Sequence, residues 1–95
     1  MYFDPVETGK RIAVLRTSRK MTQSQLADKL NISRPHLAKV ETGAKTPSLD
    51  LMIEIAEFMN VSLDYLVLGK KLPMDEVRIE INSLIAKLSA IEREF

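Results

Sequence analysis

Basic side chains gather in the middle of this 95-residue chain, between residues 19 and 45. Six Lys and Arg residues occur in this stretch against only two acids, Asp28 and Glu41. The bases are Arg19, Lys20, Lys29, Arg34, Lys39 and Lys45. An excess of this sign suits the neutralisation of nucleic-acid phosphates. Taken alone, however, so modest an excess is better explained by an ordinary solvated surface. The choice between that surface and nucleic-acid binding depends on the secondary-structure elements that carry the charges.

The stretch from 22 to 43 predicts two short helices joined by a tight polar corner. Thr22 followed by Gln25 is a capping box, in which each side chain satisfies a free backbone amide. After the corner, Ser33 can cap a second helix that Gly43 ends. The apolar positions recur at helical spacing: Leu26, Ala27 and Leu30, then Leu37 and Val40. Two helices joined in this way match the helix-turn-helix unit, whose second helix enters the major groove of DNA.

Arg16 and Glu41 are charged residues at positions where a lone charge would be costly. Asp4 as a cap, with Pro5 after it, predicts a first helix that runs to about Lys20. The inward positions of this helix are Ile12, Leu15 and Val6, and Arg16 lies close to that stripe. Glu41 is the only acid in the second helix of the helix-turn-helix unit. We therefore predict a partly buried ion pair between them; the alternative is two unrelated surface charges.

A polar loop and two further helices follow the helix-turn-helix unit. Lys45 and Thr46 lie in the loop and are candidates for phosphate contact. The next helix should place its apolar residues in the core: Leu49, Met52, Ile53, Ile55, Ala56 and Met59. Leu51 and Phe58 should lie on another face, covered by the C-terminal helix or by a second subunit. A short fifth helix over 61–69 completes a five-helix domain.

From Met74 the pattern changes to a heptad repeat. Apolar residues recur at spacings of four and three over about three repeats. These residues are Val77, Ile81, Leu84, Leu88, Ile91 and Phe95. Charge changes at the same place, because residues 1–72 carry eleven bases against eight acids whereas residues 73–95 carry three against five. We predict a DNA-binding domain over 1–72 and a dimerisation helix over 73–95; the alternative is that this helix packs back on its own domain.

The composition argues against catalysis, metal binding and membrane insertion. The chain has no cysteine and one histidine, so thiolate chemistry is excluded and a protein-built metal site is not expected. His36 has no evident catalytic partner, and no glycine-rich phosphate loop is present, so we predict no enzymatic activity and no cofactor. No apolar run is long enough to span a bilayer, and Met1 to Asp4 does not resemble a secretory signal. We expect a soluble cytoplasmic protein.

Residues 9–69 resemble the helix-turn-helix domain of lambdoid phage repressors and Cro-like regulators, the XRE family. Several landmarks occur in family order: GKRIAVLR at 9–16, MTQSQLA at 21–27, LNIS at 30–33, TPS at 46–48 and VSLDYLVLG at 61–69. Leu37, Val40, Glu41 and Gly43 also fit the family series. The resemblance implies an all-α fold, a five-helix lambda-repressor-like DNA-binding domain to which this chain adds a C-terminal amphipathic helix.

The resemblance also implies roles for individual residues. Gln23 corresponds to a phosphate clamp, and Ser33 to the cap that presents the recognition helix near a phosphate. Arg34, His36 and Lys39 correspond to base readers. Helical geometry supports these base-reading positions independently, because the first turn of a recognition helix faces the floor of the groove. Residues three to four positions further along lie on the same face of the helix. For His36, a solvated or locally capping side chain is the alternative.

Pro35 departs from the family pattern, in which many members place an amide or hydroxyl side chain at this position. Proline cannot donate a hydrogen bond, but its ring can contact a thymine methyl group, so we include it among the base-reading residues. Proline also disfavours helical backbone geometry at the residue before it, so Pro35 affects the direction in which the Arg34 side chain points.

The sequence therefore predicts a transcriptional repressor that binds a palindromic double-stranded DNA operator as a homodimer. The alternative is an antitoxin or adaptor whose C-terminal helix binds a partner protein, with DNA binding as autoregulation.

Overall fold

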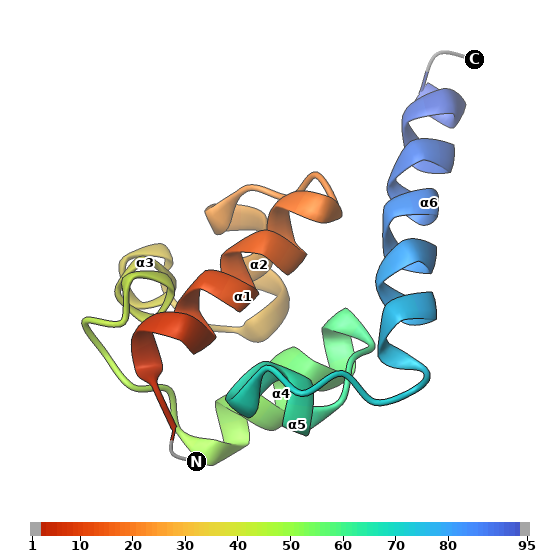
Figure 1. The fold of residues 1–95 in the computed structure, drawn as a ribbon. Helices are drawn as coiled ribbons and strands as arrows, with labels where there is room; N and C mark the ends of the chain where they lie inside the picture. The colour runs from red at the N-terminus through yellow and green to blue at the C-terminus, as the bar shows by residue number, and fades with distance from the viewer. Residues whose placement is uncertain (1–2, 94–95) are drawn as a thin grey trace.

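Every regular element of the protein is a helix in the part of the chain that the structure describes. The computed structural model describes the backbone of residues 3–93 and the side chains of residues 3–90 (Figure 1). The helices are α1 (Pro5–Ser18), α2 (Gln23–Leu30), α3 (Arg34–Thr42), α4 (Leu49–Met59), α5 (Leu63–Leu68) and α6 (Asp75–Arg93). The predicted all-α fold, five helices followed by a C-terminal helix, is confirmed.

The helix starts predicted from side-chain caps are confirmed. The Asp4 carboxylate accepts hydrogen bonds from the backbone amides of Val6 and Glu7 at the start of α1. Thr22 and Gln25 form both halves of a capping box at the start of α2. Ser33 accepts from the His36 amide at the start of α3, as a helix N-cap does. These caps satisfy amide groups that have no partner inside the helix.

Helix ends depend on residues that adopt left-handed backbone geometry. Gly43 ends α3 at φ 82°, as expected for glycine after a helix. Asn31 ends α2 at φ 58°, a position where asparagine is tolerated because its short polar side chain bonds locally. Lys20 also adopts a positive φ, 55°, and α1 ends at Ser18 rather than at the predicted Lys20.

One core joins α1 to α5, and every apolar residue predicted for the core of α1 to α3 except Val6 is buried. On α4 the predicted orientation is partly wrong, because Leu49 is 60% exposed and Ile53 is 40% exposed. Leu51, predicted for another face, is buried in the core of its own subunit. The buried stripe of α4 is instead Leu51, Ile55, Ala56 and Met59, because the side of α4 that is covered is decided by where α4 packs against α1, α2 and α5.

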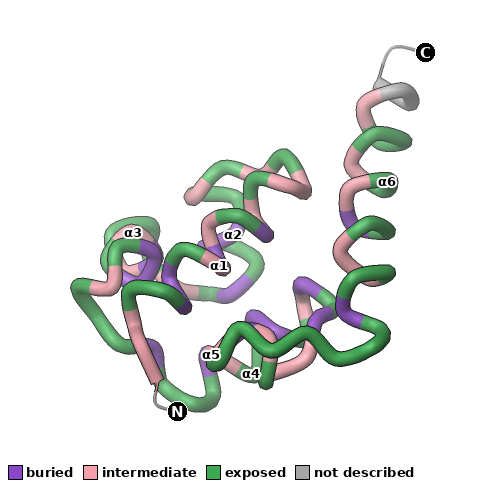
Figure 2. The backbone as a smooth tube through the Cα atoms, in the orientation of Figure 1, coloured by how far each residue is buried: buried purple, intermediate pink, exposed green. Residues whose placement is uncertain are grey.

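Helix α6 extends away from the body of the molecule, and among its residues 75–90 the two buried ones, Asp75 and Asn82, lie in the first half of the helix (Figures 1 and 2). Ile79 packs against the core. The buried Asn82 amide donates to the Met59 carbonyl oxygen at 2.6 Å, which satisfies the last turn of α4. These contacts dock the start of α6 against the region where α4 ends and α5 begins.

Asp75 fastens the first turn of α6 to the start of α5. Its carboxylate accepts from the Ser62 backbone amide at 2.8 Å, the Ser62 hydroxyl at 2.7 Å and the Leu72 backbone amide at 2.7 Å. Burial alone would raise the pKa of Asp75, but these hydrogen bonds and the nearby charge of Arg78 outweigh it and hold the pKa below its ordinary value. The chain from α5 to α6 is therefore fixed by one ionised side chain.

The four heptad residues whose side chains are described face away from the body, since Val77, Ile81, Leu84 and Leu88 are between 43% and 55% exposed. Ile85, which is 45% exposed, lies on another side of α6. Helix α6 does pack on its own domain, as the alternative stated, but through a different face that carries Asp75, Ile79 and Asn82. The side chain of Ile91 and the residue Phe95, both predicted for dimerisation, lie outside the described residues. Dimerisation itself stays a prediction.

Candidate nucleic-acid interface

The corner between α2 and α3 is built by local hydrogen bonds. The Asn31 amide donates to the Ala27 and Asp28 carbonyl groups, and the Ile32 amide donates to the Ala27 carbonyl at 3.0 Å. Ser33 then starts α3 without a further linker. Leu30 and Leu37 on the two sides of the corner are both buried. The corner therefore holds α3 at a set angle to α2, which is what a recognition helix requires.

A buried charged network ties α3 to α1. The Arg16 guanidinium donates through Nε to Glu41 Oε2 at 2.7 Å and through Nη2 to Oε1 at 3.1 Å. Its Nη1 donates to the Met21 carbonyl oxygen at 2.8 Å. The side chains of Arg16 and Glu41 are only 14% and 5% exposed. The two residues predicted to pair thus lie in a bidentate ion pair, the stronger geometry for arginine and carboxylate.

Gln23, predicted as a phosphate clamp, belongs to the same network. Its Nε2 donates to Glu41 Oε1 at 2.9 Å, so the network reaches from α1 through α3 to the first residue of α2. An amide nitrogen carries two hydrogens, so a second donor of Gln23 is left for another acceptor. The network orients Gln23 at the N-terminal end of α2, where an anion is favoured by the helix dipole.

Gly9 lets α1 and α3 approach closely, and the sequence reasoning missed this role. A Cβ atom at Gly9 would lie 2.5 Å from the backbone oxygens of both Val40 and Glu41. No L side chain fits there unless the helices separate. A glycine inside a predicted helix was the available signal, since it often marks a close backbone contact.

The outward face of α3 carries most of the predicted base readers. Arg34, Pro35 and Lys39 are exposed, whereas the opposite face of the helix is buried in the core. Thr42 is also exposed one turn beyond Lys39, and sequence reasoning did not select it. Its helical spacing from Pro35 and Lys39 was the signal that could have found it.

His36 lies on the flank of α3 rather than with Arg34 and Lys39. It is half-buried and lines a shallow groove with Ile32 and with the acids Asp50 and Glu54 of α4. The structure therefore separates His36 from the exposed readers.

The predicted phosphate-contacting residues border α3 at both ends. Ser33 is exposed at its N-terminus, and Lys45 and Thr46 are exposed in the loop after its C-terminus. The Lys45 backbone amide donates to the Lys39 carbonyl oxygen at 3.2 Å, which folds this loop back against the last turn of α3. Cationic and hydroxyl side chains in these places suit backbone phosphates on either side of a groove.

Other kinds of site receive no support from the described residues. Among the side chains of residues 3–90, no group of three or more His, Asp or Glu is placed to hold a metal ion. None of the helices within residues 3–93 is both long and apolar enough to cross a membrane.

Comparisons with known proteins agree with this geometry. The family model described as "Helix-turn-helix" matches residues 12–66, which run from α1 to α5. The uncharacterized HTH-type transcriptional regulator YqaE of Bacillus subtilis (strain 168) is 37% identical over 82 residues, which are 83% of this chain and 71% of YqaE. The immunity repressor protein of Bacillus phage phi105 is 37% identical over 75 residues, 79% of this chain and 51% of the phage protein.

The relatives include an activator as well as a repressor. The HTH-type transcriptional activator BcrR of Enterococcus faecalis is 34% identical over 67 residues, 70% of this chain and 33% of BcrR. The chain thus spans about half of the phage repressor and a third of the activator. The matched family model, the similar regulators and the all-helical fold agree with one another. The chain belongs to the XRE (Cro/C1-type) family of helix-turn-helix, DNA-binding transcriptional regulators.

Proposed function

We propose that this regulator represses transcription by binding a palindromic operator as a homodimer. Residues 1–72 form the DNA-binding part, with the helix-turn-helix unit at 22–43, and residues 73–95 form the dimerisation part. The observation that carries this proposal is the exposed heptad face of α6, which is attached to a family-typical reading head but not covered by it.

On DNA, α3 lies in the major groove and its outward face reads bases. Arg34 donates to guanine O6 and N7, and Lys39 contacts a base or the adjacent phosphate. Pro35 packs on a thymine methyl group. His36 is assigned a contact at the edge of this face, because its position on the flank of α3 supports no central one. Gln23, Ser33, Lys45 and Thr46 hold the phosphates that border the groove.

In the proposed dimer, the heptad face of α6 from one copy packs against the same face of the other copy. An exposed apolar stripe on a helix is removed from water when an identical stripe packs against it. The groove along this stripe is lined by Val77, Ile81 and Leu84 together with Glu80 and Lys87, so a second copy offers both an apolar seam and opposite charges. Symmetric pairing is the commonest arrangement for soluble oligomers.

Sedimentation of the full chain with Leu84→Glu tests the dimer. A carboxylate in the seam is left unpaired when two copies pack, so the variant should sediment as a monomer and lose operator affinity. Val14→Glu is the matched control, since Val14 is 61% exposed on α1 and Leu84 is 55% exposed on α6. The control should remain dimeric. An unchanged dimer for Leu84→Glu would contradict the proposal.

The same exposed face of α6 also suits the alternative function, an antitoxin or adaptor that binds a partner protein. The two functions predict different oligomeric states for the isolated parent chain: a dimer for the repressor and a monomer for the alternative. A monomeric parent chain that binds the operator weakly and forms a defined complex with an unrelated protein through Leu84 would favour the alternative.

A further inference from the structure

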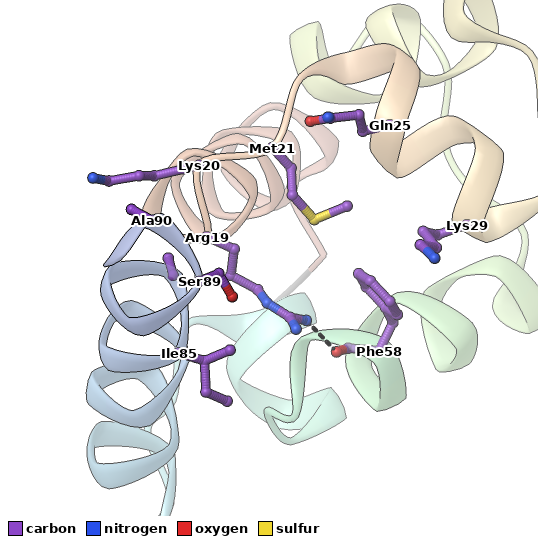
Figure 3. A pocket seen from close by; sticks show the side chains of 10 residues that line it. Arg19, Lys20, Met21, Gln25, Lys29, Phe58, Ile85, Ser89 and Ala90 are labelled. Atoms are coloured by element: carbon purple, nitrogen blue, oxygen red, sulfur yellow. Dashed lines mark hydrogen bonds between the residues drawn. The ribbon is translucent and has the colours of Figure 1, made fainter. Parts of the chain in front are cut away.

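A cleft of about 420 Å³ lies between the second half of α6 and the body of the molecule (Figure 3). One wall is α6, with Ile85 and Ser89. The opposite side is the connection from α1 to α2, with Arg19 and Met21, and the side chain of Phe58 on α4. This volume falls within the range of small-molecule sites in proteins. The cleft is separate from the outward face of α3.

The lining combines cations with apolar groups. Arg19, Lys20 and Lys29 carry its positive charge, and no acid occurs among the described residues that line it. Within residues 3–90, none of these three cations has a carboxylate within 4.0 Å. Met21 and Phe58 form an apolar surface beside them. A ligand that matches this lining carries a negative head and an apolar body.

Arg19 is held in place inside the cleft. Its Nη1 donates to the Phe58 carbonyl oxygen at 2.8 Å, and its guanidinium lies 4.7 Å from the centre of the Phe58 ring. A guanidinium has five N–H donors, so these contacts leave others free to bind an anion. Figure 3 shows the Met21 side chain projecting toward the same space, while Lys20 points outward at its rim. Arg19 is therefore held against Phe58, the aromatic residue of the cleft.

We propose that this cleft binds an amphipathic carboxylate, with the anionic head on Arg19 and the aliphatic body between Met21, Phe58 and Ile85. A bound molecule would fasten residues 83–90 of α6, none of which is buried, whereas Asp75, Ile79 and Asn82 attach the first half of the helix to the body. The ligand would thus stabilise one orientation of the helix that carries the heptad face, to the extent that it prefers that orientation. The binding site does not depend on the proposed operator or on dimerisation.

Titration of the full chain with decanoate, followed through the methyl resonances of Met21 and Ile85, tests the site. Saturable shifts of both methyl groups are expected, because the aliphatic body contacts both. Decanol has the same body without the charge and should bind about tenfold more weakly, since hydrogen bonds to charged groups are stronger. Amide exchange in residues 83–90 should slow when decanoate is bound.

Paired charge variants separate binding in the cleft from general attraction to a basic protein. Lys20→Gln with Lys29→Gln should weaken decanoate binding about fivefold, as expected for the loss of two exposed charges. Lys70→Gln with Lys71→Gln removes the same charge from the exposed linker before α6 and should leave binding unchanged. Equal losses in both pairs, equal binding of decanol, or shifts confined to Leu84 and Leu88 on the heptad face would overturn the proposal.

Discussion

At the scale of single residues, the reading surface is defined by a few exposed side chains on α3 and by a buried network behind it. Arg34 and Lys39 point away from the core, whereas Glu41 on the same helix is buried and paired with Arg16. In the proposed DNA complex the exposed side chains contribute to recognition, whereas the buried ion pair contributes to the stability of the fold. Substitutions at the two kinds of position should therefore change different measured quantities.

Arg34→Ala and Lys45→Ala should weaken DNA binding in different ways. Loss of a bidentate base contact costs about 1–3 kcal/mol and relaxes one position of the operator, whereas loss of a phosphate contact weakens all sequences alike and lowers the salt slope by about one. Binding to operator and random DNA over a series of salt concentrations measures both effects. Lys70→Ala, in the linker before α6, is the control. Identical profiles for the Arg34 and Lys45 variants would refute the separate roles.

Arg16→Met should destabilise the fold by about 3 kcal/mol, because it leaves the buried Glu41 carboxylate without a cationic partner. Urea denaturation of the free protein measures this loss. Lys10→Gln breaks the Lys10–Glu7 pair, whose side chains are 67% and 52% exposed, and should cost less than about 1 kcal/mol. Similar losses from the two variants would mean that the buried pair contributes no more than a surface pair.

At the scale of elements, the helices are placed by close contacts at a few positions. Gly9 allows the α1 backbone to touch α3, the Ser33 cap starts α3, and Asn82 attaches α6 to the end of α4. Asp75 is the contact with a pH-dependent component. Its carboxylate accepts three hydrogen bonds, two from Ser62 at the start of α5 and one from Leu72 in the linker. Protonation of the carboxylate would weaken its ability to accept them.

The stability that Asp75 contributes should disappear in acid. The pKa of Asp75 is lowered in the folded protein, so its contribution is complete above the unfolded pKa of about 3.9 and is lost as the pH falls through the folded pKa. Asp75→Asn should lower the free energy of unfolding by about 1–3 kcal/mol near pH 7, because donors lose their acceptor.

Urea denaturation at neutral pH and at a pH below the pKa of Asp75 in the folded protein measures how the free energy of unfolding depends on pH. The difference between the parent chain and Asp75→Asn should shrink in acid. Asp64→Asn is the control, since Asp64 is exposed on α5. A difference that stays constant with pH would show that the ionised carboxylate contributes nothing specific.

At the scale of the whole molecule, the proposed function depends on how a dimer holds its two DNA-binding domains. The described heptad residues of α6 are exposed and so is the outward face of α3, so both surfaces are accessible on one subunit. In the proposed dimer, two copies of α3 reach successive major grooves on one side of the DNA. Their separation should then be about 34 Å, one turn of the double helix.

Operator spacing tests this arrangement. An insertion of about five base pairs between the half-sites turns the second half-site to the opposite side of the DNA, given about ten base pairs per turn. Affinity should fall to that of a single half-site, as measured by gel mobility or fluorescence anisotropy. Single-half-site DNA is the direct comparison. Unchanged affinity after the insertion would exclude a rigid dimer with this geometry.

The sequence by itself determined the helices, their caps and the helix-turn-helix unit, because these depend on neighbouring residues. Capping at Thr22 and Ser33, the glycine stop at Gly43 and the apolar spacing of α2 and α3 are local properties of the chain. The family motifs between residues 9 and 69 are short segments of this kind, so they could be identified from the sequence alone. The outward orientation of Arg34 and Lys39 followed from the period of a single helix.

Only the tertiary structure decided which faces meet. The burial of Leu51, the exposure of Leu49, the flank position of His36 and the close approach at Gly9 depend on where separate helices cross. The face of α6 that docks on the body was likewise decided by the fit of Asp75 and Asn82 to partners distant in sequence. Apolar periodicity identifies the stripes of a helix, but the choice between an intramolecular and an intermolecular partner depends on the surfaces that the rest of the fold presents.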